Sequence, residues 1–370
     1  MVPPSRWAQP VRFAVIVAVL GVVATIAQTP QSADQDIYQQ IGRSGIVLNC
    51  ADIHCFRVLP APILEHLPGP SVVKWKAYAV VTNAAGAVAL GMLCGVLGLS
   101  ARASGFATWI AAFGLGPLQS VFDPYTSDPV MYLVGPVLVA ELLRNRIGRA
   151  TLVGSAGVLF KEFAAAPLWI FALASALRRQ WNVAARVALA ASTATLVWFT
   201  LQTVLLTVFN YSYGGNKSVD LLHGGYLAVW LAALGWPKAI AYLIVTFGPL
   251  FLLMAAGFPR AGQPLRALTV ASLAPAAVLM YVQQPDRALW NFHFLVIPIA
   301  MLVLQELPDR LCWMFVVAFA AANLRLGEPQ PAAVSWIRGV MFGVSIALAL
   351  AAVARARQHA GRVGAGAVWE

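Results

Sequence analysis

Apolar residues run along this sequence in long stretches that are separated by short polar connections. We mark twelve such stretches, at 11–28, 73–99, 104–121, 129–143, 150–160, 163–177, 184–208, 239–258, 265–282, 291–305, 311–324 and 333–354. A helix needs about 20 mostly apolar residues to cross the hydrocarbon core of a bilayer. The pattern therefore predicts an all-α, polytopic integral membrane protein with about twelve transmembrane helices.

The composition favours the same class. Of the 370 residues, 60% are hydrophobic and 11% are charged, whereas about 25% of the residues in an ordinary soluble domain are charged. These values disfavour a soluble enzyme. We expect one transmembrane domain over 1–357, in which the long outer loop 29–72 carries interfacial helices, and a disordered cytoplasmic tail at 358–370.

The distribution of charge predicts the orientation in the membrane. With a cytoplasmic N-terminus and a crossing at each stretch, the inner connections hold 15 basic and 4 acidic residues, which is the whole net charge of +11. Positive residues accumulate on the cytoplasmic side of membrane proteins. We therefore expect both termini in the cytoplasm and loops 29–72 and 209–238 outside, and nucleic acid is not needed as a partner to explain the charge.

Two segments have alternative interpretations. The first stretch follows Arg6 and Arg12, as in a cleaved signal peptide, but we favour a retained anchor because it would position the polar loop that follows. The segment 226–236 is too short to span a bilayer and has aromatic residues at both ends, which predicts an interfacial or re-entrant helix.

The four cysteines fall into two pairs. Cys94 and Cys312 lie inside apolar stretches, whereas Cys50 and Cys55 lie in the first outer loop, where an oxidising compartment permits a disulfide. The sequence leaves that disulfide open. A metal cluster of Cys50, His54 and Cys55 is disfavoured, because its crowded ligands lack the usual spacing of a zinc site.

The first candidate residues for chemistry follow the first stretch. At helical spacing Asp34 and Tyr38 lie on one face, so a carboxylate and a phenol can point together into a cavity at the membrane surface. Asp36 lies between them, and a solvated loop carboxylate is the alternative for either acid. Farther along, Arg57 stands among apolar residues and two prolines, which predicts an amphipathic segment at the interface.

Further charged residues stand where outer connections enter later stretches. Helix capping explains Asp128, but it does not explain Asp123. Lys161 and Glu162 interrupt an apolar run, and ionisable residues at that depth indicate a functional site unless they simply pair with each other.

The tenth stretch repeats this pattern. Asp286 and Arg287 precede it and His293 lies at its beginning. A lone histidine such as His293 is more typical of a packing residue than of a catalyst.

These patches, in this order, resemble the GT-C superfamily of polytopic glycosyltransferases, which take sugars from polyprenyl-phosphate carriers on the outer face of the membrane. The resemblance rests on short motifs within 34–38, 56–60, 127–129, 157–162 and 286–287. In the arrangement of spans and loops, the resemblance covers most of the chain. It implies a polyprenyl-phosphate-linked sugar as donor and, without the large C-terminal soluble domain of several relatives, a lipid or glycan as acceptor.

The resemblance also implies roles for residues. Asp34 matches the catalytic base, with Asp36 as its competitor, and the donor phosphate and sugar would be bound by Arg57, Asp128, Lys161, Glu162 and Arg287. Tyr38, Asp123 and His293 are further candidates. The chemistry agrees, because transfer from a sugar phosphate needs a base for the acceptor hydroxyl and positive groups for the leaving phosphate.

The cofactor, the location and the rival functions complete these expectations. No cofactor is required, although a divalent cation such as Mg²⁺ or Mn²⁺ would take Asp34 and Asp128, with Asp36 and Asp123 as further oxygen ligands. We expect the bacterial cytoplasmic (inner) membrane, with membrane lipid around the protein and the site facing the periplasm. A polysaccharide polymerase or ligase and a secondary transporter are the alternatives. Transporters usually contain repeated halves, and residues 1–185 and 186–370 show no such repeat.

Overall fold

The computed structural model describes residues 8–31, 33–212, 236–280 and 285–366, and within these ranges it contains helices and no strand. Five helical segments are long and apolar enough to cross a membrane. They are α1 (Ala8–Ile26), α4 (Ser71–Val96), α10 (Trp181–Thr207), Asp286–Leu304 and the part of α20 (Ala332–Gly366) that ends at His359. The all-helical membrane architecture is therefore confirmed, whereas the number of twelve spans stays a prediction.

The other helices are shorter, and several expected stretches are broken into two helices. They are α5 (Ala101–Ala112), α6 (Leu115–Phe122), α7 (Asp128–Leu143), α8 (Ile147–Gly157), α9 (Ala166–Leu177), α13 (Trp236–Phe247), α14 (Pro249–Gly257), α15 (Gln263–Ala271), α16 (Leu273–Leu279), α17 (Pro285–Leu289), α18 (His293–Leu304) and α19 (Asp309–Asn323).

The break between α13 and α14 has a local cause. The helical pair Pro237–Phe247 and Pro249–Arg260 bends by 104° and would form a sixth span if the two helices act as one. At the bend Gly248 has a φ of 52°, a value that glycine adopts readily. Pro249 follows and has no N–H to continue the helical hydrogen bonds.

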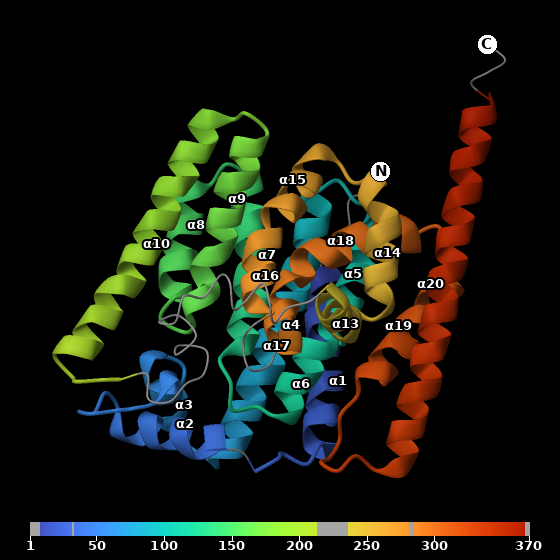
Figure 1. Cartoon of the computed structure of the whole chain (residues 1–370). Helices are drawn as coiled ribbons and strands as arrows, with labels where there is room; N and C mark the ends of the chain where they lie inside the picture. The colour runs from blue at the N-terminus through green and yellow to red at the C-terminus, as the bar shows by residue number, and fades with distance from the viewer. Residues whose placement is uncertain (1–7, 32, 213–235, 281–284, 367–370) are drawn as a thin grey trace.

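The connections between helices gather at two ends of a helix bundle. Figure 1 shows α2 (Ala33–Ser44) and α3 (Ala61–Glu65) at one end and the last turns of α20 at the other. Backbone hydrogen bonds at the first end join segments far apart in sequence, from Gln28 N–H to Leu326 O (2.8 Å) and from Leu59 N–H to Leu159 O (3.1 Å). In the described part of the chain, segments that the charge pattern assigns to the outer side therefore lie together. Their orientation toward the periplasm stays a prediction.

The first helix is fixed to the fourth. Ile16 and Leu20 of α1 are buried, and Lys76 of α4 donates hydrogen bonds to the carbonyls of Ala24 (2.7 Å) and Ala27 (2.8 Å). Because the last carbonyls of a helix have no partner within the helix, a lysine in this position stabilises its end. The loop that carries α2 therefore starts from an anchored point.

A second, smaller core lies under the outer loop. The ring of Trp75 lies 5.0 Å from that of Tyr38 and 5.4 Å from that of Tyr125, measured between centroids. A disulfide joins Cys50 to Cys55. This core fixes α2 and the 3-10 helix η1 (Ile53–Phe56) against α4, and the interfacial position of these helices stays a prediction.

Two expectations concern other parts of the chain. Helix α20 continues as far as Gly366, and the disorder expected for the tail 358–370 stays a prediction. This stretch is free of proline, and His359 binds the Glu306 carboxylate at 2.7 Å. The expected helix at 226–236 lies outside the described residues except for Trp236, where α13 begins.

Candidate active site

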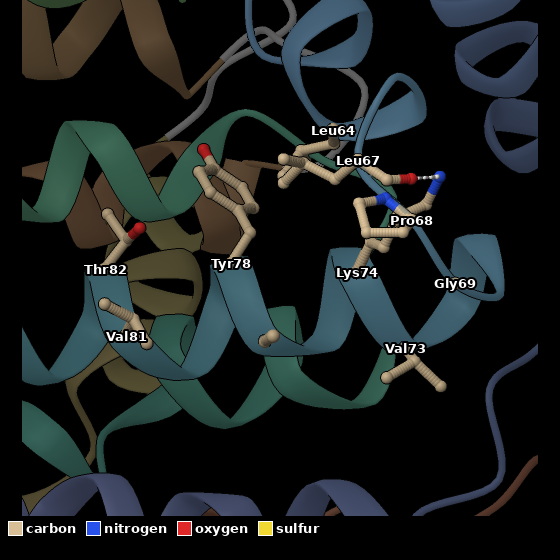
Figure 2. A pocket seen from close by; sticks show the side chains of 10 residues that line it. Leu64, Leu67, Pro68, Gly69, Val73, Lys74, Tyr78, Val81 and Thr82 are labelled. Atoms are coloured by element: carbon tan, nitrogen blue, oxygen red, sulfur yellow. Dashed lines mark hydrogen bonds between the residues drawn. The ribbon is translucent and has the colours of Figure 1, made fainter.

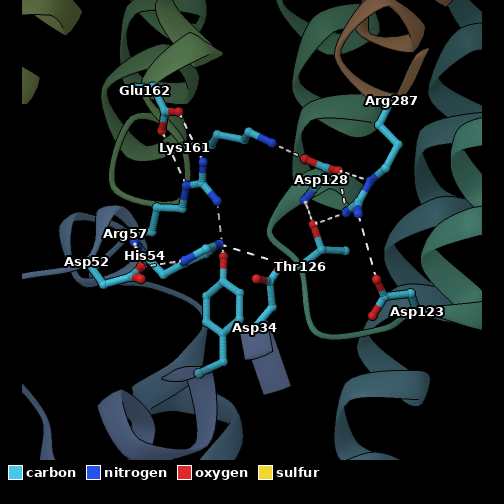
Figure 3. A network of polar contacts seen from close by, with 11 residues as sticks. Asp34, Asp52, His54, Arg57, Asp123, Thr126, Asp128, Lys161, Glu162 and Arg287 are labelled. Atoms are coloured by element: carbon cyan, nitrogen blue, oxygen red, sulfur yellow. Dashed lines mark hydrogen bonds and ion pairs between the residues drawn. The ribbon is translucent and has the colours of Figure 1, made fainter. Parts of the chain in front are cut away.

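Charged residues from separate segments meet at the end of the bundle that carries α2 (Figure 3). The polar network consists of Asp34, Tyr38, Asp52, His54, Arg57, Asp123, Thr126, Asp128, Lys161, Glu162 and Arg287. Most of these residues are the ones that the sequence singled out.

Asp128 lies at the centre of this network. It is the first residue of α7 and is 4% exposed. Lys161 binds its Oδ1 atom, and Arg287 binds Oδ2 through Nη2 (2.8 Å) and Nε (2.9 Å). The N-cap position belongs to Ser127. Capping therefore does not account for Asp128, whose carboxylate joins two cations.

Arg287 also approaches a second carboxylate. Its Nη1 atom lies 3.8 Å from Asp123 Oδ2, and its Nη2 atom donates to Thr126 Oγ1 at 2.8 Å. Burial raises the pKa of Asp123 to about 6, although the charge of Arg287 lowers it and the charges of Asp34 and Asp128 raise it further. Asp123 is thus an acid that changes charge near neutral pH.

Arg57 forms the other half of the network. It follows η1 and donates to the two oxygens of Glu162 at 3.2 and 3.4 Å, and to the Tyr38 hydroxyl at 3.3 Å. Burial lowers its pKa, but the charges and hydrogen bonds of Glu162 and Tyr38 together hold the pKa of Arg57 above its ordinary value. Lys161 pairs with Asp128 and Glu162 pairs with Arg57, so the alternative that Lys161 and Glu162 only pair with each other is wrong.

A close approach of helices places Lys161 and Glu162. At Gly157, the last residue of α8, a Cβ atom would lie 2.8 Å from Cβ of Ala164 and 3.4 Å from Cγ1 of Val134. Glycine therefore allows α8 to end against the 3-10 helix η2 (Glu162–Ala165), which contains Ala164. The chain then turns, with Lys161 N–H bonded to Gly157 O at 3.0 Å, and the two charged side chains follow directly.

The first outer helix supplies an accessible carboxylate. Asp34 lies on α2 with Oδ2 3.7 Å from His54 Nε2, and its side chain is 36% exposed. Tyr38, one turn later, is buried and contacts Arg57, so the two residues share a face as the spacing predicts. Asp36 is exposed, and in the described part of the chain it has no ion pair in the network.

His293 lies outside the network. Its Nδ1 atom is 2.9 Å from the carbonyl of Trp290, and its ring stacks on the Trp290 indole with a centroid separation of 5.8 Å. These contacts are those of a packing residue, which is the interpretation that the sequence favours for a lone histidine.

Asp52, Thr126 and the contact between His54 and Asp34 are not indicated by any clear sequence pattern. The only local sign was an Asp and a His two positions apart, just before Arg57 and between two cysteines.

The divalent cation expected at Asp34 and Asp128 stays a prediction. Both oxygens of Asp128 are bound by cations. Within the described ranges, no group of three or more His, Cys, Asp or Glu residues is arranged to hold a metal ion.

An apolar groove of about 560 Å³ opens beside the site (Figure 2). It runs along α4 and is lined mainly by apolar side chains, including Leu64, Leu67, Val73, Tyr78 and Val81. The Tyr78 ring lies 5.9 Å from that of Trp75, which in turn packs on Tyr38. A layer of aromatic rings therefore separates the groove from the polar network.

Comparison with solved structures identifies an architectural relative. No family model and no curated protein matches the sequence. Among solved structures, the crystal structure of the Archaeoglobus fulgidus oligosaccharyltransferase in the apo form matches with a TM-score of 0.52 and 12% identity. The match covers 94% of this chain and 56% of that chain. At this identity the match shows a shared fold.

Proposed function

We propose that the protein is an inverting membrane glycosyltransferase that moves a sugar from a polyprenyl-phosphate donor to a lipid or glycan acceptor. It would act on the outer face of the cytoplasmic membrane of a bacterium. One observation carries the proposal: Arg57, Lys161 and Arg287, from three distant segments, meet in a buried network beside the accessible carboxylate of Asp34. Buried cations within a membrane protein are costly and indicate a functional site.

The cations suit a phosphate group. In the structure each is paired with a carboxylate, and a donor phosphate that enters the network would exchange places with one of these partners. The Lys161 ammonium acts as a point charge, whereas the guanidinium of Arg287 or Arg57 presents two parallel donors to a phosphate. These groups would stabilise the negative charge that develops on the leaving phosphate.

Asp34 suits the role of general base. Its carboxylate would take the proton from the acceptor hydroxyl as that oxygen bonds to the anomeric carbon of the sugar. The bond between the sugar and the phosphate oxygen breaks at the same time, and its electron pair stays on the phosphate. Attack from the face opposite the phosphate inverts the anomeric configuration.

The groove along α4 would hold the apolar part of the donor. Its lining by Leu64, Leu67, Val73 and Val81 matches the chemistry of an isoprenoid chain. It lies one layer of rings from the network, so chain and phosphate can be bound by neighbouring parts of the protein.

The test is release of the carrier. The purified chain in nanodiscs would be incubated with farnesyl-phosphate-linked mannose, glucose or arabinose and an extract of bacterial envelope glycolipids. We expect release of farnesyl phosphate that depends on the extract and is lost in Asp34→Asn. No release with any donor would contradict the proposal, and movement of intact donor across proteoliposomes without release would support the transporter alternative. A ladder of lengthening products would favour the polymerase.

A further inference from the structure

A histidine between two carboxylates stands next to the proposed base. The Nδ1 atom of His54 lies 2.5 Å from Asp52 Oδ1, which also accepts the His54 backbone N–H at 2.8 Å. On the opposite side of the ring, Nε2 lies 3.7 Å from Asp34 Oδ2. The three side chains thus form a series in which His54 lies between the carboxylates of Asp34 and Asp52 (Figure 3).

The loop that carries this histidine is held in place. The Cys50–Cys55 disulfide closes it, and the Cys50 carbonyl accepts a hydrogen bond from Ser212 N–H at 2.9 Å. The edge of the His54 ring meets the Tyr38 ring at a centroid distance of 5.1 Å. The side chain is 15% exposed, so it is partly accessible to water.

The charges around His54 define its tautomer. Asp34 and Tyr38 face it from α2, Asp52 faces it from its own loop, and Arg57 follows three residues later. An ionised carboxylate only accepts hydrogen bonds, so the short contact to Asp52 assigns the neutral-ring proton to Nδ1. The hydrogen bond with His54 lowers the pKa of Asp52, which keeps that carboxylate ionised. Nε2 then turns a lone pair toward Asp34.

We propose that His54 receives the proton from Asp34 after each sugar transfer, with Asp52 holding the ring in the accepting tautomer. The inference rests on the proposed function. In the step, the O–H bond of protonated Asp34 breaks and an N–H bond forms at Nε2. The imidazolium between Asp34 and Asp52 is stabilised by both negative charges, and it returns its proton to water. His54 is a positioning residue that acts through Asp34.

The experiment compares kcat and KM in the farnesyl phosphate release assay. His54→Gln should lower kcat at neutral pH by at least about tenfold and leave KM for the donor within about twofold. Asp52→Asn should lower kcat in the same direction.

Two controls separate this role from others. His66 is an exposed histidine at the end of α3, and His66→Gln should leave kcat unchanged. A His54→Gly variant regains activity with added imidazole if the ring acts chemically, and this test holds even if the Gln variant does not fold.

The outcomes are distinct. An unchanged kcat in His54→Gln, a rise in KM alone, or a failure of imidazole to restore His54→Gly would overturn the relay while Asp34→Asn remains inactive. Absence of farnesyl phosphate release from the wild type would overturn the proposed function, and the relay with it.

Discussion

Lys161 and Arg287 bind opposite oxygens of one carboxylate, that of Asp128. The lysine is 33 residues and the arginine 159 residues away from it in sequence. Asp128 is buried at the first position of α7. Helix α7 therefore fixes the position of the carboxylate that the two cations bind. The spacing between these cations is therefore determined by the fold.

Replacement of Asp128 should destabilise the protein. Asp128→Asn leaves two buried cations without a full negative partner, and removal of one partner from a buried ion pair costs about 3–5 kcal/mol. Thermal unfolding in detergent measures this loss. Asp309→Asn is the matched control, because Asp309 pairs with Arg102 at an exposed position and such pairs contribute about 0–1 kcal/mol. Equal losses in the two variants would contradict the central role of Asp128.

Asp34→Asn should abolish most turnover without loss of folding or of carrier binding. Asn keeps the shape of the side chain but cannot accept the proton, and loss of a general base costs on the order of 100- to 10,000-fold in rate. The control is Asp36→Asn, on the same helix and exposed. An active Asp34→Asn with an inactive Asp36→Asn would move the base to Asp36, and activity in both would remove the support for a carboxylate base in α2.

Lys161→Ala and Arg287→Ala should each weaken binding of farnesyl phosphate by more than tenfold, or about 1.4 kcal/mol. Each variant removes a cation that the phosphate would contact. Binding is measured by titration of the purified variants in nanodiscs, with melting temperatures recorded on the same samples. Arg43→Ala, an exposed cation at the end of α2, should bind like the wild type. Unchanged affinity in both site variants would eliminate the phosphate site.

The stability difference between Asp123→Asn and the wild type should depend on pH. The pKa of Asp123 is raised from 3.8 to about 6, so the folded protein favours the protonated acid. This contribution to stability is fully present below about pH 4 and is lost as the pH rises through 6. Relative to the wild type, Asp123→Asn should therefore gain melting temperature between pH 4 and 7. A constant difference over this range would contradict the raised pKa.

Single cysteines test the orientation. The charge pattern predicts that a cysteine at Gly45 is labelled from outside and one at Arg146 from the cytoplasm, in a background without the free cysteines Cys94 and Cys312. Gly45 follows α2, and Arg146 precedes α8 at the other end of the bundle (Figure 1). Labelling of both positions from the same side would reject the topology.

Local patterns in the sequence predicted the parts of the site that depend on neighbouring residues. The shared face of Asp34 and Tyr38 follows from helical spacing alone. The partners of Lys161 and Glu162 could not be predicted in this way, because Glu162 meets Arg57 across 105 residues. The cost of a buried charge indicates that a partner exists, but the tertiary fold decides which one.

Dependence on the tertiary fold also explains why other features could not be predicted from the sequence. The sequence indicates no role for His54 beyond a disfavoured metal cluster, because its approach to Asp34 depends on how the disulfide-closed loop folds. Hydrophobicity located the apolar stretches, but it did not show that 239–258 bends at Gly248 and Pro249, because both sides of the break are equally apolar.

A cryo-EM map of the protein with bound decaprenyl phosphate tests the central claim most directly. The account predicts phosphate oxygens within hydrogen-bond distance, about 3 Å, of the Lys161 ammonium and the Arg287 guanidinium, with the Asp34 carboxylate facing the same cavity. A phosphate bound elsewhere, with Lys161 and Arg287 still on Asp128, would contradict it.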